Sequence, residues 1–197
     1  MVIGITGGIG TGKSSVVEIL KEKGYAVLSA DAISHEIMTP DSSVVNRLRS
    51  VFGEEIICPD GTLNRKDLAQ KAFSRPENTE KLNEIVQQAI KEELTARITR
   101  LKQEDPLQVI IAEIPLLYEA GWDDLCDSVW TITAEMDTRI RRIMQRDGVK
   151  KRVARVRMKY QMDEDEKIAK ADIVIHNDGS LTELREKVEK ALTYVDQ

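Results

Sequence analysis

The chain has 197 residues, of which 41% are hydrophobic and 32% are charged. This composition is typical of a globular protein with one α/β core and a small insertion. A formal net charge of −5 argues against a general nucleic-acid binder, and no apolar run approaches the ~20 residues that cross a bilayer. Cys58 and Cys126 are too few for a disulfide scaffold. We expect a cytoplasmic protein without nucleic-acid or membrane partners, present as a monomer or a weak homo-oligomer.

Short apolar runs rich in β-branched residues alternate with segments of helical periodicity. The runs predict strands at residues 2–6, 25–28, 109–114, 129–133 and 173–175. The helical segments lie at residues 14–23, 32–38, 43–52, 65–73, 77–102, 136–145, 150–170 (with a break) and 181–194. This alternation predicts an α/β fold in which a parallel sheet is covered by helices on both faces. Residues 32–105 carry almost no strand signal, so we expect a helical insertion that binds the second substrate.

The first predicted strand leads into the most informative segment, residues 7–14, which reads Gly-Gly-Ile-Gly-Thr-Gly-Lys-Ser. It satisfies the pattern G-x-x-x-x-G-K-[ST] of the phosphate-binding loop and lies between a predicted strand and a predicted helix, as that loop requires. Glycines let consecutive backbone N–H groups turn around a phosphate at a helix N-terminus. Lys13 can follow the β- and γ-phosphates, and the Ser14 hydroxyl is placed for Mg²⁺. A chance glycine-rich turn is the alternative, and the flanking strand and helix argue against it.

Asp31 follows the second predicted strand. In a phosphoryl-transfer enzyme, a carboxylate at this edge of the sheet can orient an attacking hydroxyl group and accept its proton. The alternative role for an Asp in this place is the N-cap of the helix predicted at residues 32–38. Position alone leaves both roles open.

A second acid ends the apolar run Val-Ile-Ile-Ala-Glu at residues 109–113. A strand that ends in an acid is the Walker-B arrangement, in which Glu113 would steady Mg²⁺ or its water shell. The alternative is an acid that faces solvent at the end of a strand.

A basic island lies between Arg139 and Lys159, with ten Lys or Arg residues and one acid, Asp147. Arg139, Arg142 and Arg146 recur at a spacing that places them on one face of a helix. Planar guanidinium groups suit phosphates, so we favour phosphate contact for Arg142 and Arg146, whereas a solvated helix face is the alternative. The island is helical and could form a mobile lid over the nucleotide.

Together, the motifs resemble those of the dephospho-coenzyme A kinases, and the resemblance covers nearly the whole chain. Besides the phosphate loop, it rests on Ala-Asp at 30–31, Phe-Gly at 52–53, Asp-Gly-Thr-Leu-Asn-Arg at 60–65, Leu-Asn at 82–83, Pro-Leu-Leu-Tyr-Glu at 115–119, Gln-Arg-Asp at 145–147, Gln161, and Ala-Asp-Ile-Val-Ile-His-Asn-Asp-Gly-Ser at 171–180. The phosphate loop alone indicates only the superfamily of P-loop proteins. The Pro-Leu-Leu-x-Glu element and the segment at 171–180 narrow the resemblance to this family. The chain differs from the family pattern at three places. Ser29 and Glu113 occupy positions where Asp is usual, and Gln87-Gln88 occupies the position of a common His-Pro pair.

The resemblance implies ATP-dependent phosphorylation of the ribose 3′-hydroxyl of dephospho-coenzyme A, the last step of coenzyme A synthesis. It implies a five-stranded P-loop kinase fold, with a nucleotide core at residues 1–31, 106–147 and 171–197, an acceptor domain at 32–105 and a lid at 148–170. Lys13, Asp31 and Arg142 would be catalytic. ATP would be bound by Gly8, Ile9, Gly10, Thr11, Gly12, Lys13, Ser14, Ser15, Arg146 and Asn177; the acceptor by Thr6, Asp31 and Leu116; and Mg²⁺ by Ser14 and, through water, Glu113.

Two other functions compete with this one. A kinase for another small hydroxylated acceptor, such as a nucleoside monophosphate, would share the fold and the ATP site. A nucleotide-controlled binding switch would hydrolyse ATP or GTP without an acceptor. The chain has neither the Asn-Lys-x-Asp motif that reads guanine nor the Leu-Ser-Gly-Gly-Gln signature of ABC transporters, which argues against a switch of either class.

Overall fold

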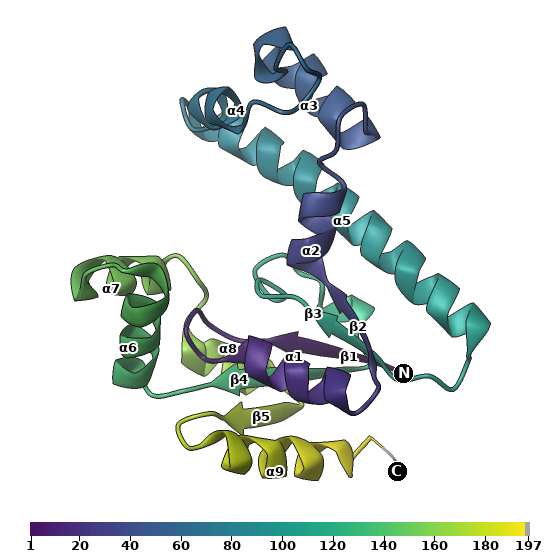
Figure 1. Ribbon diagram of the computed structural model, residues 1–197, viewed down its shortest axis with the longest axis vertical. Coiled ribbons are helices and arrows are strands. Elements are labelled where there is room, and N and C mark those ends of the chain that lie inside the picture. Colours follow the sequence, from purple (N-terminus) through teal and green to yellow (C-terminus); the bar gives the residue numbers. More distant parts are fainter. Residues whose placement is uncertain (196–197) are drawn as a thin grey trace. The chain divides into compact units, whose positions relative to one another are not determined.

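The computed structural model describes residues 1–195 (Figure 1). The chain divides into two compact units, one made of residues 1–29 and the segment from residue 101 onward, the other of residues 30–100. Each unit has its own cluster of buried apolar side chains. The expected nucleotide-core segment 171–197 includes residues 196 and 197, which lie outside the described residues.

The first unit is built around a five-stranded sheet with the strand order β2-β3-β1-β4-β5. Its strands are β1 (Val2–Thr6), β2 (Ala26–Ser29), β3 (Ile110–Glu113), β4 (Ser128–Thr133) and β5 (Ile173–His176). All neighbouring strands are parallel, and Ile5 in the central β1 is in register with Glu113 and Trp130. The predicted five-stranded parallel sheet is therefore confirmed, and the carboxyl ends of its strands meet at one edge.

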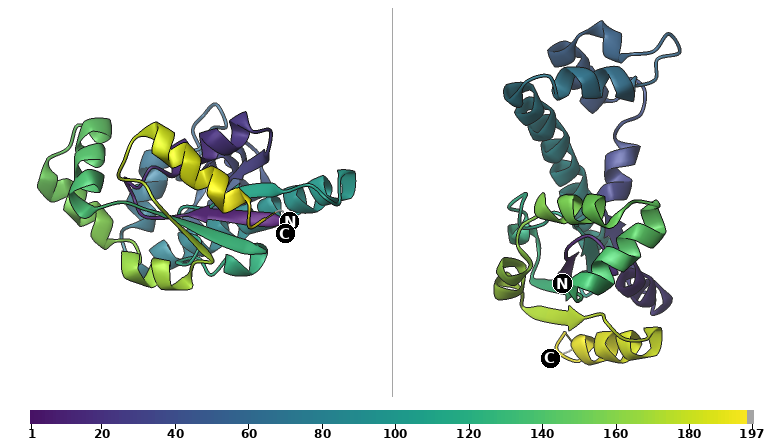
Figure 2. Two further views of the ribbon diagram at one scale, coloured as in Figure 1. Left: turned by 90° about the horizontal axis from the view of Figure 1, so that it is seen from below. Right: turned by 90° about the vertical axis from the view of Figure 1, so that its left-hand side faces the viewer.

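Helices cover both faces of this sheet because alternate residues of a strand point to opposite faces. Ile3 and Ile5 belong to the larger core cluster, which joins the strands to α1 (Lys13–Glu22) and α9 (Leu181–Leu192). On the other face α8 (Glu164–Lys170) packs near β4, where the Thr131 hydroxyl donates a hydrogen bond to the Lys167 carbonyl. The left view of Figure 2 shows α9 and α8 on opposite sides of the strands.

Three helices follow β4 on the way to β5, and the helix predicted at 150–170 is indeed interrupted. α6 (Met136–Asp147) ends at Gly148, whose φ of 65° lies in the left-handed region. α7 (Lys151–Lys159) is separated from α8 by a linker, residues 160–163. The Asp163 side chain caps α8 by accepting a hydrogen bond from Asp165 N, and Ser180 forms the predicted capping box of α9.

The second unit, residues 30–100, is helical and overlaps most of the insertion expected at residues 32–105. It contains α2 (Ala30–Glu36), α3 (Ser43–Phe52), α4 (Arg65–Ala72) and most of α5 (Pro76–Glu104). Ser42 and Asn64 cap α3 and α4 with side-chain hydrogen bonds to Val45 N and Asp67 N. Its core consists of apolar side chains from α3, α4, α5 and the short 3-10 helix Glu54–Ile56: Val44, Leu48, Phe52, Ile56, Leu68, Ala72, Ile85 and Ala89.

The start of α2 corrects one prediction. The helix begins at Ala30 rather than at residue 32, so Asp31 lies within its first turn. The N-cap alternative for Asp31 is therefore wrong, although an acid in the first turn still benefits from the helix dipole. Within residues 1–195, none of the helices is both long and apolar enough to span a membrane.

Candidate nucleotide site

The phosphate loop connects the end of β1 to the start of α1, as predicted. Gly10 and Gly12 have φ values of 81° and 90°, which only glycine adopts without strain. Thr11 is buried, and its hydroxyl donates a 2.9 Å hydrogen bond to the Gly8 carbonyl. Gly12 is the N-cap of α1 and offers no side-chain cap, so the helix N-terminus is open to an anion.

Lys13 lies over the first residues of the same loop. Its Nζ donates hydrogen bonds to the carbonyl oxygens of Gly7 at 2.7 Å and Gly8 at 3.2 Å. Ser14 and Ser15 follow at the first turn of α1 and are exposed. An ammonium group and a hydroxyl group are thus held beside the open helix N-terminus, which is the chemistry that a nucleoside triphosphate requires.

The loop glycines also leave room for α6 and β5. A Cβ on Gly10 would lie 2.8 Å from the Arg139 carbonyl oxygen, and a Cβ on Gly12 would collide with the Asn177 amide nitrogen. Asn177 is 6% exposed, and its Nδ2 donates a 2.8 Å hydrogen bond to the Thr11 carbonyl. Asn177, which we expected to bind ATP, thus supports the phosphate loop in this structure, a role with no signal in the local sequence.

Arg139 lies beneath the loop, so the alternative of a solvated helix face is wrong for this residue. It is 6% exposed, and its Nε donates a 3.1 Å hydrogen bond to the Ile9 carbonyl. Its Nη1 forms an ion pair with Glu164, the first residue of α8, and burial lowers the pKa of the guanidinium. Arg139 is therefore a structural support of the loop.

Arg142 and Arg146 differ from Arg139 and from each other. Arg142 donates hydrogen bonds to three backbone carbonyls, those of Gly10, Thr11 and Asn177. This places a permanent positive charge against the phosphate loop, and the expected contact of Arg142 with phosphate stays a prediction. Arg146 is exposed and pairs with Asp147 at 2.7 Å, and this hydrogen bond raises the pKa of the arginine.

The carboxyl edge of the sheet holds the other predicted residues of the first unit. Glu113 ends β3 beside Ile5 and is half-buried. Thr6 is fully buried, and its hydroxyl donates a 3.3 Å hydrogen bond to Pro115 O, whereas Leu116 is 43% exposed. Asp31 belongs to the second unit, where its carboxylate is exposed on the first turn of α2.

The donor set fits Mg²⁺ as part of a nucleotide complex. Ser14 supplies a hydroxyl oxygen and Glu113 a carboxylate oxygen, which are the hard ligands that this ion prefers. Among residues 1–195 no cluster of three or more His, Cys, Asp and Glu side chains could hold a metal by itself. Phosphate oxygens and water would therefore have to complete the coordination.

Two polar residues close to this site had no predicted role. Gln161, in the linker between α7 and α8, accepts a 2.7 Å hydrogen bond from Ile9 N. Glu119 accepts one from Met162 N at 3.0 Å and forms a 2.7 Å ion pair with Lys167, which is 1% exposed. Burial pushes the pKa of Glu119 upward, but Lys167 and backbone N–H groups outweigh it and hold that pKa below its ordinary value.

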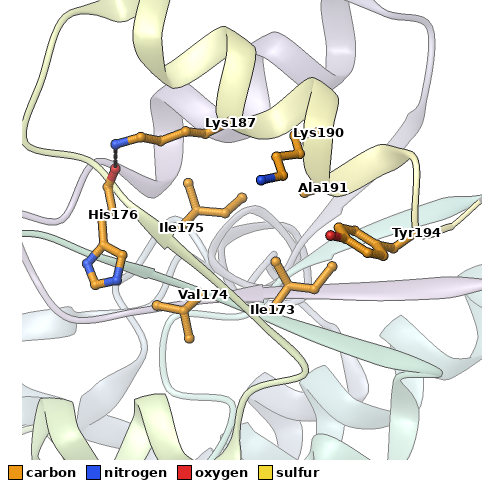
Figure 3. A pocket seen from close by; sticks show the side chains of 8 residues that line it. All are labelled: Ile173, Val174, Ile175, His176, Lys187, Lys190, Ala191 and Tyr194. Carbon is orange, nitrogen blue, oxygen red and sulfur yellow. Dashed lines mark hydrogen bonds between the residues drawn. The ribbon is translucent and has the colours of Figure 1, made fainter.

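A separate hollow of about 300 Å³ lies between β5 and α9 and contains none of the predicted site residues (Figure 3). Apolar side chains of β5 form its floor, and Lys187 crosses its rim to donate a 2.7 Å hydrogen bond to the His176 carbonyl. Lys190 and Tyr194 complete the opposite wall. We assign this hollow no part in the reaction.

A glycine-rich loop between the central strand of a parallel sheet and the following helix, with a lysine and arginines gathered against it, defines a P-loop kinase. The family model of dephospho-CoA kinases matches residues 1–183, and the chain belongs to that family. The expected family membership is thus confirmed.

Known proteins agree with this assignment over almost the whole chain. A dephospho-CoA kinase from Syntrophotalea carbinolica is 41% identical over 188 residues, which are 95% of this chain and 89% of that protein. A solved structure from Thermus thermophilus has a TM-score of 0.80 and 34% identity, with 99% of this chain and 95% of that chain covered. The dephospho-CoA kinase from Campylobacter jejuni has a TM-score of 0.74 and 27% identity, with coverage of 98% and 96%.

Proposed function

We propose that this chain transfers the γ-phosphoryl group of ATP to the ribose 3′-hydroxyl of dephospho-coenzyme A, giving coenzyme A and ADP. The observation that carries the proposal is the family match over residues 1–183, which includes the whole phosphate loop and the strand edge around it. The acceptor oxygen attacks the γ-phosphorus in line, the bond to the bridging oxygen of ADP breaks, and the hydroxyl proton leaves to a base. No covalent enzyme intermediate is required.

The phosphate loop and its neighbours hold the nucleotide in this proposal. The loop from Gly8 to Ser15 surrounds the phosphates with backbone N–H groups other than that of Ile9, which is bonded to Gln161. Lys13 exchanges the carbonyls of Gly7 and Gly8 for the β- and γ-phosphates. Arg142 stabilises charge on the transferred group, with Arg146 nearby and Asn177 close to the adenine. These contacts would position the reactants and neutralise developing charge, which is most of what phosphoryl transfer asks of a protein.

Mg²⁺ is part of the proposal because Ser14 and Glu113 supply suitable oxygens. When bound with ATP, the ion would neutralise charge on the phosphates. Ser14 would hold it directly, and Glu113 would hold it through a water molecule.

Asp31 is the proposed base, and the helical segment 32–105 is the proposed acceptor domain. The carboxylate would orient the 3′-hydroxyl and take its proton, while Thr6 and Leu116 contact the acceptor. Residues 148–170 would close as a lid and exclude water, whose attack on ATP is the wasteful side reaction. We further propose a cytoplasmic protein, monomeric or weakly self-associating, that binds no nucleic acid.

The test is ADP release from MgATP with and without dephospho-coenzyme A, with the product identified by mass. We expect release that depends on the acceptor and a product heavier by one phosphoryl group. Lys13→Ala should abolish turnover, whereas Lys21→Ala, which removes an exposed lysine of α1, should not. Release without the acceptor, or faster transfer to a nucleoside monophosphate, would contradict the proposed substrate.

A further inference from the structure

The peptide groups of Ile9, in the phosphate loop, are held from two sides. The Ile9 N–H donates a 2.7 Å hydrogen bond to Gln161 Oε1, and the Ile9 carbonyl accepts one of 3.1 Å from Arg139 Nε. The two partners come from different elements, since Arg139 lies on α6 and Gln161 lies in the linker between α7 and α8. Ile9 directly precedes Gly10, where the loop turns.

Gln161 is itself held in place. Its backbone N–H donates a 3.2 Å hydrogen bond to the Met158 carbonyl at the end of α7. The next residue, Met162, donates a 3.0 Å hydrogen bond to Glu119, and Glu119 is paired with the buried Lys167 of α8. The linker is therefore bonded at successive residues to the phosphate loop and to the loop that follows β3. A linker whose backbone is fixed in this way can hold the Gln161 amide against Ile9 and so impose a position on the Ile9 peptide.

We propose that Gln161 is a positioning residue for the phosphate loop, and that its amide oxygen keeps the Ile9 peptide in the orientation that ATP binding needs. The inference rests on the proposed role of this loop in binding ATP. Glycines with positive φ make the loop easy to deform, so its N–H groups converge on a phosphate only if the flanking peptides are held. Gln161 meets this need through its hydrogen bond to Ile9, and it ties the position of the α7–α8 segment to the shape of the loop.

Three variants test this assignment. Gln161→Met keeps the length of the side chain and removes the acceptor, whereas Gln161→Glu keeps an oxygen that can accept from Ile9 N. Gln103→Met makes the same chemical change at an exposed position near the end of α5 and serves as the matched control. Each is assayed for KM of both substrates and kcat, and for amide hydrogen exchange of a peptide that contains Ile9, without nucleotide.

Gln161→Met should raise the KM for ATP about five- to tenfold, the range for one lost neutral hydrogen bond. The KM for dephospho-coenzyme A should stay within about twofold. Exchange at Ile9 should speed up in Gln161→Met and return toward the wild-type rate in Gln161→Glu, while Gln103→Met changes neither quantity. Unchanged exchange and unchanged KM for ATP in Gln161→Met would overturn the proposal, and so would equal rises in both KM values. Exchange and ATP affinity can be measured even if the acceptor is another molecule, so failure of the proposed substrate would be recognised separately.

Discussion

Residues of the same type have different roles in this site. Arg139 and Arg142 are one turn apart on α6, yet Arg139 is buried with Glu164 while Arg142 donates to carbonyls of the phosphate loop. The same residue type thus does different work because the helix presents one guanidinium beneath the loop and the other beside it.

Asp31→Asn separates catalysis from binding. The amide keeps the size of the side chain but cannot take a proton, so kcat should fall by a factor of ~10²–10⁴. The affinity for ATP, measured by calorimetry, should stay nearly unchanged because the phosphate loop belongs to the other unit. Asp41→Asn, at an acid in the turn after α2, is the control and should retain wild-type kcat. A kcat for Asp31→Asn close to that of the wild type would reduce Asp31 to a residue of the first helical turn.

Cys126 should resist alkylation in the folded protein. Burial raises the pKa of its thiol from 9.0 to about 12, with a further contribution from Asp127 and other nearby acids. At pH 8 this shift lowers the thiolate fraction about 10³-fold. In a Cys58→Ser background, iodoacetamide should react with Cys126 at least about 10²-fold faster after unfolding in urea than before. Similar rates in both states would show that the thiol is accessible and ordinary.

At the scale of elements, the glycines of the phosphate loop meet two conditions at once: they adopt left-handed backbone conformations, and they leave room for neighbouring side chains. Gly12 needs a left-handed conformation and also lies against Asn177. Gly24, after α1, has nearly the same φ of 88°, but nothing lies within 4 Å of a Cβ built there. Both positions therefore require a left-handed backbone, but only Gly12 also requires that no Cβ be present.

This pair makes a matched experiment. Both Gly12→Ala and Gly24→Ala should lose about 1–2 kcal/mol of unfolding free energy in urea, the strain of a left-handed alanine. Only Gly12→Ala also displaces the Asn177 amide, so only this variant should weaken ATP binding, by more than about tenfold. If Gly24→Ala weakened ATP binding as much, general destabilisation rather than loop packing would be the cause.

The elements themselves were largely predictable, and their contacts were not. Short apolar runs, most of them rich in β-branched residues, predicted all five strands of the sheet, and the Ser180 capping box predicted the start of α9. The periodicity of α6 grouped Arg139 with Arg142, because spacing along a helix carries no information about what covers it. Gln161 and Glu119 were noted as motif residues, but their contacts escaped prediction for a related reason: their hydrogen-bond partners lie 152 and 43 residues away along the chain.

For the whole molecule, the ion pair between Glu119 and Lys167 links stability to pH. The pKa of Glu119 lies below its ordinary value of 4.5, because Lys167 and backbone N–H groups outweigh the effect of burial. A carboxylate with a lowered pKa stabilises the fold fully above that ordinary value, and the contribution is lost as pH falls through the lower, folded value.

Glu119→Gln should therefore lower the unfolding free energy at pH 7. It should also make that free energy fall less steeply as the pH is lowered than it does in the wild type. We expect a loss of about 1–3 kcal/mol at pH 7, since Lys167 keeps a neutral acceptor and Glu119 is partly in solvent. Urea unfolding at pH 7 and at about pH 3 should show that the difference between variant and wild type shrinks in acid. Glu189→Gln, which breaks an exposed pair with Lys23, should change stability little at either pH. A difference for Glu119→Gln that is constant with pH would contradict the linkage.

The position of β1 at the centre of the sheet has a consequence for synthesis on the ribosome. Val2–Thr6 leaves the exit tunnel long before its two partners, because Ile110–Glu113 and Ser128–Thr133 are encoded more than a hundred residues later. At ~5–20 residues per second, this strand waits for several seconds to some twenty seconds before it can pair. Residues 30–100 have their own core and can fold during that interval. The nascent chain must therefore keep an unpaired apolar strand from aggregation while its middle is already folded, so slow translation or scarce chaperones should limit its yield before they limit its activity.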